Sequence, residues 1–228
     1  MNLSKLFQIQ SELDKRILKE HGLEGQDLLD KKILALQVEL GELANEWRGF
    51  KFWSKNQKPK RVIHTTAGAN QENAAYFQCS NDECGLYLTH EDFVNAFDEP
   101  NYEDCPKCEV GYVYSFKEKN PLLEEYVDCL HFILSIGLEL QATEIIIDSD
   151  YTEENTVKTF MKIYDLISII LMDVETDTFR SHIRPDYEEL FNTFVGLGEK
   201  YLGFTWEQIE QAYLDKNKIN HNRQANGY

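Results

Sequence analysis

Apolar side chains recur every three or four residues along most of the chain. Residues 3–21 carry one such stripe, which ends at a His-Gly-Leu-Glu-Gly segment. A second stripe lies within residues 28–49 and consists of Leu36, Leu40, Leu43 and Trp47. Because this spacing places side chains on one face of an α-helix, each segment is predicted to form an amphipathic helix.

The same periodicity returns in the second half of the chain. A helix is predicted to begin at Pro121, where proline suits the first turn, and to end near residue 142. Further helices are predicted over residues 155–174 and 186–201. Thr205, followed by a glutamine three residues later, has the capping-box pattern and predicts the start of a last helix.

Residues 57–118 interrupt the helical pattern. Cysteines, aromatic residues and turn formers gather there, and stretches such as Gly-Tyr-Val-Tyr-Ser-Phe are typical of strands. We therefore predict an all-α fold in which residues 1–56 and 119–228 form a discontinuous helical bundle. A small β-rich module, residues 57–118, is inserted between the second and third helices.

Four of the five cysteines fall within this insertion as two close pairs, Cys79 with Cys84 and Cys105 with Cys108. Two such pairs are typical of a tetrahedral Zn²⁺ site, and the strand-like flanks favour a zinc ribbon. Four protein ligands leave no position open to water, so the Zn²⁺ would be structural. The alternative is four cysteines without a metal; Cys129 is expected to pack in the core.

Two rows of carboxylates follow helical spacing. Glu39, Glu42 and Glu46 lie within about 60° of one another on the second predicted helix, where a solvated acidic face is one interpretation. On the third, Glu125 and Asp128 stand among apolar side chains that cover almost the whole circumference, as in a buried helix. Burying carboxylates requires salt bridges or a hard divalent cation, and four oxygen ligands on facing helices suit Mg²⁺.

Composition limits the classes of function. Lys and Arg total 23 against 40 Asp and Glu, giving a formal net charge of −17, which argues against nucleic-acid binding. A hydrophobic content of 42% excludes a disordered acidic chain. The N-terminal segment lacks the pattern of a signal peptide and no apolar run is long enough to span a membrane, so we expect a soluble, cytoplasmic protein.

An anionic substrate would need a local basic cluster, and one occurs at the C-terminal end. No acidic residue follows Asp215, and Lys216, Asn220 and Arg223 would share one face of a helix. The planar fork of arginine and the point charge of lysine both suit phosphate. The alternative is a solvated helix end whose charges complement the helix dipole.

These motifs together resemble the dimeric dUTPases, which belong to the all-α nucleoside triphosphate pyrophosphatase, or MazG-like, superfamily. The matching segments are QIQSELD, GFKFWS, EEYVDCLHFILSIGLE and KNKINHNRQANGY. The resemblance covers residues 3–56 and 119–228. The distance from Glu42 to Glu125 is much longer than usual in that family, so the insertion is a departure from it.

The resemblance implies Mg²⁺-dependent hydrolysis of dUTP, or of dUDP as well, by a metal-activated water, with dUMP and pyrophosphate as the products from dUTP. It implies a homodimer in which Mg²⁺ is held by Glu39, Glu42, Glu125 and Asp128, with either Glu39 or Glu42 orienting the water. It also assigns phosphate contacts to Lys216, Asn217, Asn220, Arg223 and Tyr228. The uracil pocket would draw on Gln10, Asp14, Trp53 and His131, each of which could instead be an ordinary core or surface residue.

Two alternatives remain open at this point. One is the same reaction on another nucleotide, such as dCTP, or with broad specificity. The other is a catalytically silent adaptor that binds a partner through the zinc ribbon, although the complete acidic pairs and basic tail argue against silence. Because the insertion is largely acidic apart from a basic group at its edge, Lys55 to Arg61, a protein partner is favoured over DNA.

Overall fold

The structure is a computed structural model of the 228-residue chain and describes residues 2–96, 104–148, 151–176 and 180–227. The chain divides into two compact units, Met1–Pro59 with Leu122–Tyr228, and Lys60–Pro121. The insertion is predicted over residues 57–118, and each of these two boundaries lies three residues before the corresponding boundary of the second unit. No helix in the described part of the chain is long and apolar enough to cross a membrane.

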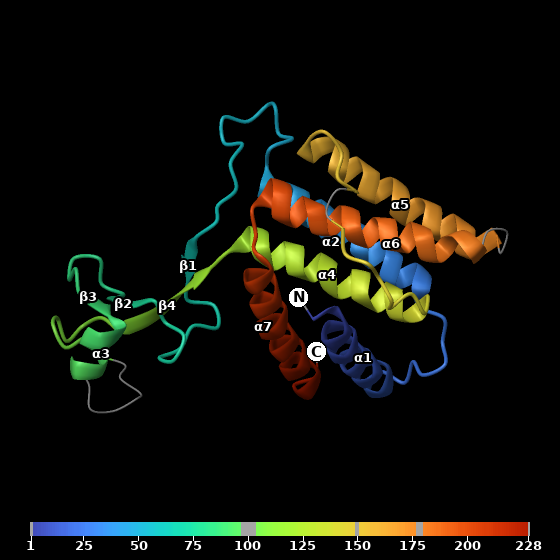
Figure 1. Ribbon diagram of the computed structural model, residues 1–228. Helices are drawn as coiled ribbons and strands as arrows, with labels where there is room; N and C mark the ends of the chain where they lie inside the picture. The colour runs from blue at the N-terminus through green and yellow to red at the C-terminus, as the bar shows by residue number, and fades with distance from the viewer. Residues whose placement is uncertain (1, 97–103, 149–150, 177–179, 228) are drawn as a thin grey trace. The chain divides into compact units, whose positions relative to one another are not determined.

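The first unit is built from α-helices (Figure 1). They are α1 (Leu3–Glu20), α2 (Leu29–Trp47), α4 (Pro121–Glu139), α5 (Thr156–Thr176), α6 (Arg180–Gly196) and α7 (Trp206–Ala225), with a π-helical segment, η2 (Leu197–Leu202), after α6. This arrangement confirms the predicted all-α fold with a small β-rich insertion. The capping box at Thr205 is also confirmed, because its hydroxyl accepts from the Gln208 backbone and the Gln208 side chain accepts from the Thr205 backbone.

Helix α4 forms the centre of this unit, because 11 of its 19 residues are buried. The apolar stripe of α2 contributes Leu36, Leu40 and Leu43 to the same core, all with no exposed surface. Cys129 of α4 is buried in this core, as predicted. Helices α5 and α6 follow each other in the chain and pack side by side, and α7 packs beside α1 (Figure 1).

Two tyrosines cross this core and lie against glycine backbone. The Tyr187 hydroxyl donates to the Ile133 carbonyl of α4 (2.7 Å), and a Cβ on Gly137 would lie 2.1 Å from that hydroxyl. A Cβ on Gly198 of η2 would likewise lie 2.5 Å from the hydroxyl of Tyr126. The helix predicted over residues 186–201 differs from the observed one. In the structure, α6 begins earlier, at Arg180, and its last turn widens into η2 beside Tyr126.

In its described residues, 60–96 and 104–121, the second unit consists of a four-stranded antiparallel sheet and one short helix. Its elements are β1 (Ile63–Thr65), β2 (Tyr76–Cys79), β3 (Tyr87–Thr89), α3 (His90–Ala96) and β4 (Val113–Lys119), with strand order β1-β4-β2-β3. Its core is small: Phe77 stacks on Phe93 of α3 at 3.9 Å, beside Ala74. Because β1 pairs with β4, Ile63 opposite Lys119, the chain enters and leaves this unit at adjacent points.

Candidate functional site

Three carboxylates from two helices converge in the first unit. One oxygen each from Glu39 of α2, Glu125 and Asp128 of α4 lie within 4.8 Å of one another. Glu39 reaches this cluster because it flanks the apolar stripe that packs α2 into the core. Glu42 lies outside this trio, yet its negative charge is close enough to raise the pKa of both Glu39 and Glu125.

The carboxylate cluster is electrostatically unfavourable by itself. Burial, followed by the charges of Asp128, Glu42 and Glu39, raises the pKa of Glu125 to about 7. Burial, Asp128 and Glu42 also raise the pKa of Glu39, while Lys216 opposes both shifts. Half-buried oxygens that repel one another are the donor set that a hard divalent cation such as Mg²⁺ requires, so these residues fit that ion.

Helix α7 supplies a cationic side chain to the cluster. The Lys216 ammonium donates to Asp128 Oδ2 at 2.5 Å, and both side chains are mostly buried. Asn220 and Arg223 follow on the same face of α7 and line one pocket with Lys216. The tail is therefore helical up to Ala225, and its polar face points at the carboxylates.

A pocket of about 210 Å³ joins these groups. Four helices line it: Gln10, Leu13, Asp14 and Ile17 of α1; Glu39 of α2; Asp128, His131, Phe132 and Ser135 of α4; and Lys216, Asn220 and Arg223 of α7. It therefore presents acidic oxygens, basic groups and an apolar wall within one cavity, as a site for a phosphorylated small molecule with an aromatic part would.

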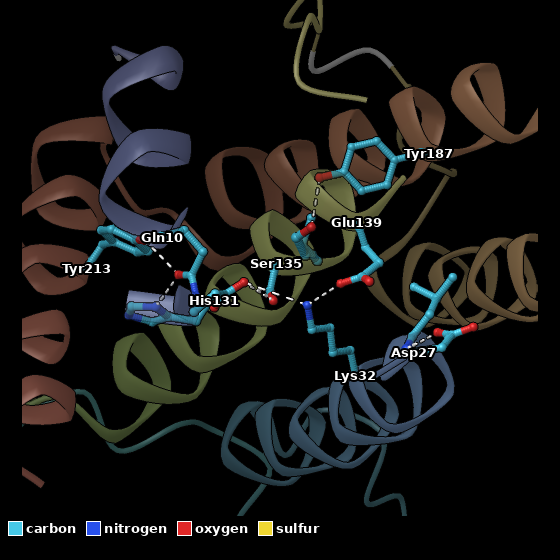
Figure 2. A network of polar contacts seen from close by, with 11 residues as sticks. Gln10, Asp27, Lys32, His131, Ser135, Glu139, Tyr187 and Tyr213 are labelled. Atoms are coloured by element: carbon cyan, nitrogen blue, oxygen red, sulfur yellow. Dashed lines mark hydrogen bonds and ion pairs between the residues drawn. The ribbon is translucent and has the colours of Figure 1, made fainter. Parts of the chain in front are cut away.

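Gln10 is fixed by three hydrogen bonds at one wall of the pocket (Figure 2). Its amide nitrogen donates to Asp14 (2.7 Å), and its oxygen accepts from the Tyr213 hydroxyl (2.8 Å) and faces His131 Nδ1 at 2.8 Å. Because the Asp14 carboxylate can only accept, the Gln10 oxygen must be the atom facing His131. His131 therefore carries its proton on Nδ1.

This tautomer leaves His131 Nε2 as an acceptor. Burial, followed by the charge of Lys216, lowers the pKa of His131 to about 3, so the ring is neutral near pH 7. Its Nε2 is buried and makes no hydrogen bond to any described residue. A buried acceptor without a partner costs free energy, and this ring also belongs to a residue that lines the pocket.

Two further residues that the sequence analysis missed contact Asp14: Ser135 and Lys32, both labelled in Figure 2. Ser135 of α4 donates to Asp14 Oδ2 at 2.5 Å, and Lys32 of α2 lies 3.8 Å from the same oxygen while it pairs with Glu139 at 2.6 Å. Ser135 stands one helical turn after His131 on a helix that is otherwise apolar at buried positions. A polar residue at a buried position of such a helix was the signal that could have identified Ser135. The contacts of Lys32 instead depend on packing between distant segments.

Two of the expected substrate-binding residues, Trp53 and Asn217, do not line this pocket. Trp53 is 66% exposed and packs against Phe50 and Phe52. Asn217 is buried on α7, and its amide nitrogen has no hydrogen-bond partner among the described residues. Tyr228 lies outside the described residues. In the second unit, the structure brings together the sulfur atoms of all four cysteines of the insertion.

Carboxylates of facing helices beside the basic face of α7 are an arrangement typical of all-α proteins with a site for an anionic small molecule. Comparison with protein families identifies the class more closely: a family described as dUTPase matches residues 2–65 and 115–228. Because the match covers most of the chain, the protein belongs to the dUTPase family, a family of nucleotide-hydrolysing enzymes. A search of curated proteins finds no match. The unmatched residues 66–114 lie inside the second unit.

Proposed function

We propose that the protein hydrolyses dUTP to dUMP and pyrophosphate in a Mg²⁺-dependent reaction. The observation that carries the proposal is the convergence of Glu39, Glu125 and Asp128. Two of them, Glu39 and Asp128, line a pocket whose other walls are the basic face of α7 and the His131 network. Membership of the dUTPase family supports a nucleotide as the substrate. The nucleotide hydrolysis that we propose extends to dUDP, which would release phosphate.

Glu39, Glu125 and Asp128, with Glu42 beside them, would hold Mg²⁺. Bound there, Mg²⁺ would neutralise phosphate oxygens and lower the pKa of a water molecule. Lys216 and Arg223 would contact the phosphate chain, since both line the pocket and carry positive charge. A carboxylate of α2, Glu39 or Glu42, would accept the proton of the attacking water.

His131 gives a physical reason for a preference for uracil. Uracil carries a proton on N3, and this N–H could donate to the unpartnered Nε2 of His131. Neutral cytosine has a lone pair at N3, so the same position would set two acceptors against each other. A site built to hydrogen-bond one group discriminates strongly against a ligand that lacks it, which favours dUTP over dCTP.

We also propose that the protein acts as a homodimer. Helices α2 and α5 pack against each other and expose large apolar side chains: Leu34, Val38, Met161, Ile169 and Met172. Exposed apolar groups of this number on adjacent helices are typical of protein interfaces. A second copy of the chain is the partner that the family resemblance favours.

The activity is tested with the purified full-length chain and each deoxynucleoside triphosphate, with and without Mg²⁺, by chromatography of the products. We expect dUTP to give dUMP and pyrophosphate only with Mg²⁺, and dCTP to react at least about 100-fold more slowly. Similar rates for several nucleotides would support the broad-specificity alternative. Absence of turnover of any nucleotide would contradict an enzymatic function.

Variants of the acidic residues test the site itself. Glu125→Gln should lower turnover at least about 100-fold, because it removes a charge from the proposed metal site. Glu46→Gln is the matched control, since Glu46 belongs to the acidic row of α2 but is not part of the three-residue cluster. Glu39→Gln and Glu42→Gln identify the base: the variant that loses turnover but still binds Mn²⁺, measured by paramagnetic resonance, has lost the proton acceptor.

A further inference from the structure

We propose that the inserted unit, residues 60–121, binds one Zn²⁺ through the thiolates of Cys79, Cys84, Cys105 and Cys108, and that this ion holds the unit folded. The site lies outside the part of the chain that matches the dUTPase family. It shares no residue with the carboxylate cluster, so it is a second and separate metal centre.

The distances between the sulfur atoms fit a zinc tetrahedron. Cys79 Sγ lies 3.8 Å from Cys108 Sγ, and Cys84 Sγ lies 3.6 Å from Cys105 Sγ. All four sulfur atoms lie within 4.8 Å of one another. With a Zn–S bond of about 2.3 Å, the edge of a regular tetrahedron is about 3.8 Å. The four cysteines are free thiols, so no disulfide competes for them.

The backbone around the cysteines is arranged to receive thiolates. The amide of Asn81 donates to Cys79 Sγ (3.3 Å), and the amide of Gly111 donates to Cys108 Sγ (3.4 Å). Amides that donate to the ligating sulfur orient it and stabilise its negative charge. Gly111 is required by sterics, because a Cβ there would lie 2.5 Å from Cys79 Sγ.

The charge and closure of the site also fit structural zinc. A Zn²⁺ ion with four thiolates carries a net charge of −2, and the Lys107 ammonium, which donates to the Cys84 carbonyl at 2.6 Å, places a positive charge beside it. Cys79 and Cys105 are buried and the other two are half-buried. Four sulfur ligands leave no position for water or substrate, which is the arrangement of structural rather than catalytic zinc.

The second unit needs the stabilisation that a bound metal ion provides, because its hydrophobic core is small. Apart from cysteines, its buried apolar residues in the described part are Ala74, Phe77 and Phe93. A unit of this size with so few buried side chains does not offset the conformational entropy lost on folding. The proposed ion would tie the end of β2 and its following turn to the loop before β4, and its binding energy becomes folding energy.

Loss of this ion should leave the helical unit folded. The inserted unit begins and ends at paired strands, Ile63 beside Lys119, so its unfolding leaves one flexible loop between adjacent points of the chain. The long loop that results carries a modest entropic cost. Zinc content and dUTP turnover are therefore expected to be separable, so that failure of one proposal leaves the other standing.

The first experiment measures metal in the full-length protein by mass spectrometry. We expect about one zinc per chain, and loss of at least 90% of it in Cys79→Ser and in Gly111→Ala. Cys129→Ala is the matched control, because Cys129 is buried in α4 away from the cluster, and it should retain zinc. Iron in place of zinc, no bound metal, or full zinc content in Cys79→Ser would each overturn the proposal.

The second experiment uses the wild-type chain and so does not depend on the folding of variants. All three tryptophans, Trp47, Trp53 and Trp206, lie in the helical unit and report its folding by fluorescence. Removal of zinc with a chelator should abolish amide-exchange protection in β2 and β4 while tryptophan emission and the protection of α4 stay unchanged. Unchanged protection of β2 and β4 after verified removal of zinc would overturn the folding role.

Discussion

Glu125 shows how a single residue joins the stability of the fold to metal binding. Its pKa is raised to about 7, mainly by burial, against an ordinary value of 4.5. Between about pH 4.5 and 7, Glu125 is therefore protonated in the folded chain but ionised in the unfolded chain. Stability that depends on this proton is present at low pH and lost as the pH rises through 7.

We expect the free energy of unfolding of the metal-free protein to fall by about 1–2 kcal/mol from pH 5 to pH 8. This is less than the full pKa shift would give, because the Glu125 side chain is only half-buried and solvent screens its charge. In Glu125→Gln, urea unfolding at pH 8 should show a higher midpoint than in the wild type, with little difference at pH 5. Excess Mg²⁺ should stabilise the wild type at pH 8 more than this variant. The exposed Glu12→Gln serves as a control. If the free energy of unfolding of Glu125→Gln falls with pH as steeply as that of the wild type, Glu125 is not the cause of the pH dependence.

At the residue scale, the positions of candidate residues could be predicted where those residues share one helix face. The shared faces of Glu125 with Asp128 and of Lys216 with Asn220 and Arg223 follow from helical spacing, because a face is fixed by 100° per residue. The approach of Glu39 to Glu125 and Asp128 depends on how α2 packs against α4. The hydrogen bonds of Ser135 with Asp14 and of Lys32 with Glu139 could not be predicted, since each joins residues more than 100 positions apart. The exposed position of Trp53 depends on a loop, for which periodicity says nothing.

At the scale of elements, α4 depends on glycine at its closest contact. Alanine is favoured over glycine by about 1 kcal/mol inside a helix. At Gly137, however, the new methyl would lie 2.1 Å from the hydroxyl of fully buried Tyr187, and overpacking costs about 1–3 kcal/mol. Gly137→Ala should therefore lower the free energy of unfolding by up to about 2 kcal/mol, measured by denaturant titration.

Gly41→Ala is the matched control in α2. A Cβ there would lie 3.5 Å from the Tyr164 hydroxyl, an ordinary contact, so the helix preference of alanine should dominate. We expect this variant to be as stable as the wild type or more stable by up to about 1 kcal/mol. If both variants shift stability in the same direction and by the same amount, helix propensity rather than the contact with Tyr187 decides the outcome.

The elements were predictable from the sequence to the extent that each carries its own pattern. Amphipathic stripes located α1, α2 and α5, and the capping box at Thr205 located α7. The nearly complete apolar surface of α4 identified it as the buried helix. The short α3 has seven residues, too few for a period to be visible. The π-helical segment η2 lies with Gly198 against the ring of Tyr126, a contact between distant residues that no local sequence pattern predicts.

Over the whole molecule, the net charge of −17 is distributed unevenly. Residues 60–121 contain five Lys or Arg against eleven Asp or Glu, whereas no acidic residue follows Asp215. An acidic surface repels the long phosphate backbone of a nucleic acid. A single nucleotide can avoid this repulsion, because the basic face of α7 lies at the pocket and the carboxylates beside it would be neutralised by Mg²⁺.

The proposed homodimer yields a prediction at the same scale. Met161 on α5 is 57% exposed, and Met161→Lys would place a charge among the apolar side chains of α2 and α5. A charge buried without a partner in an interface destabilises it by several kcal/mol, so we expect the variant to sediment at 26.7 kDa and the wild type at twice that mass. Val110→Lys, at a 79% exposed site in the insertion, should remain dimeric. A monomeric wild type would refute the homodimer, and a dimeric Met161→Lys would exclude this face as its interface.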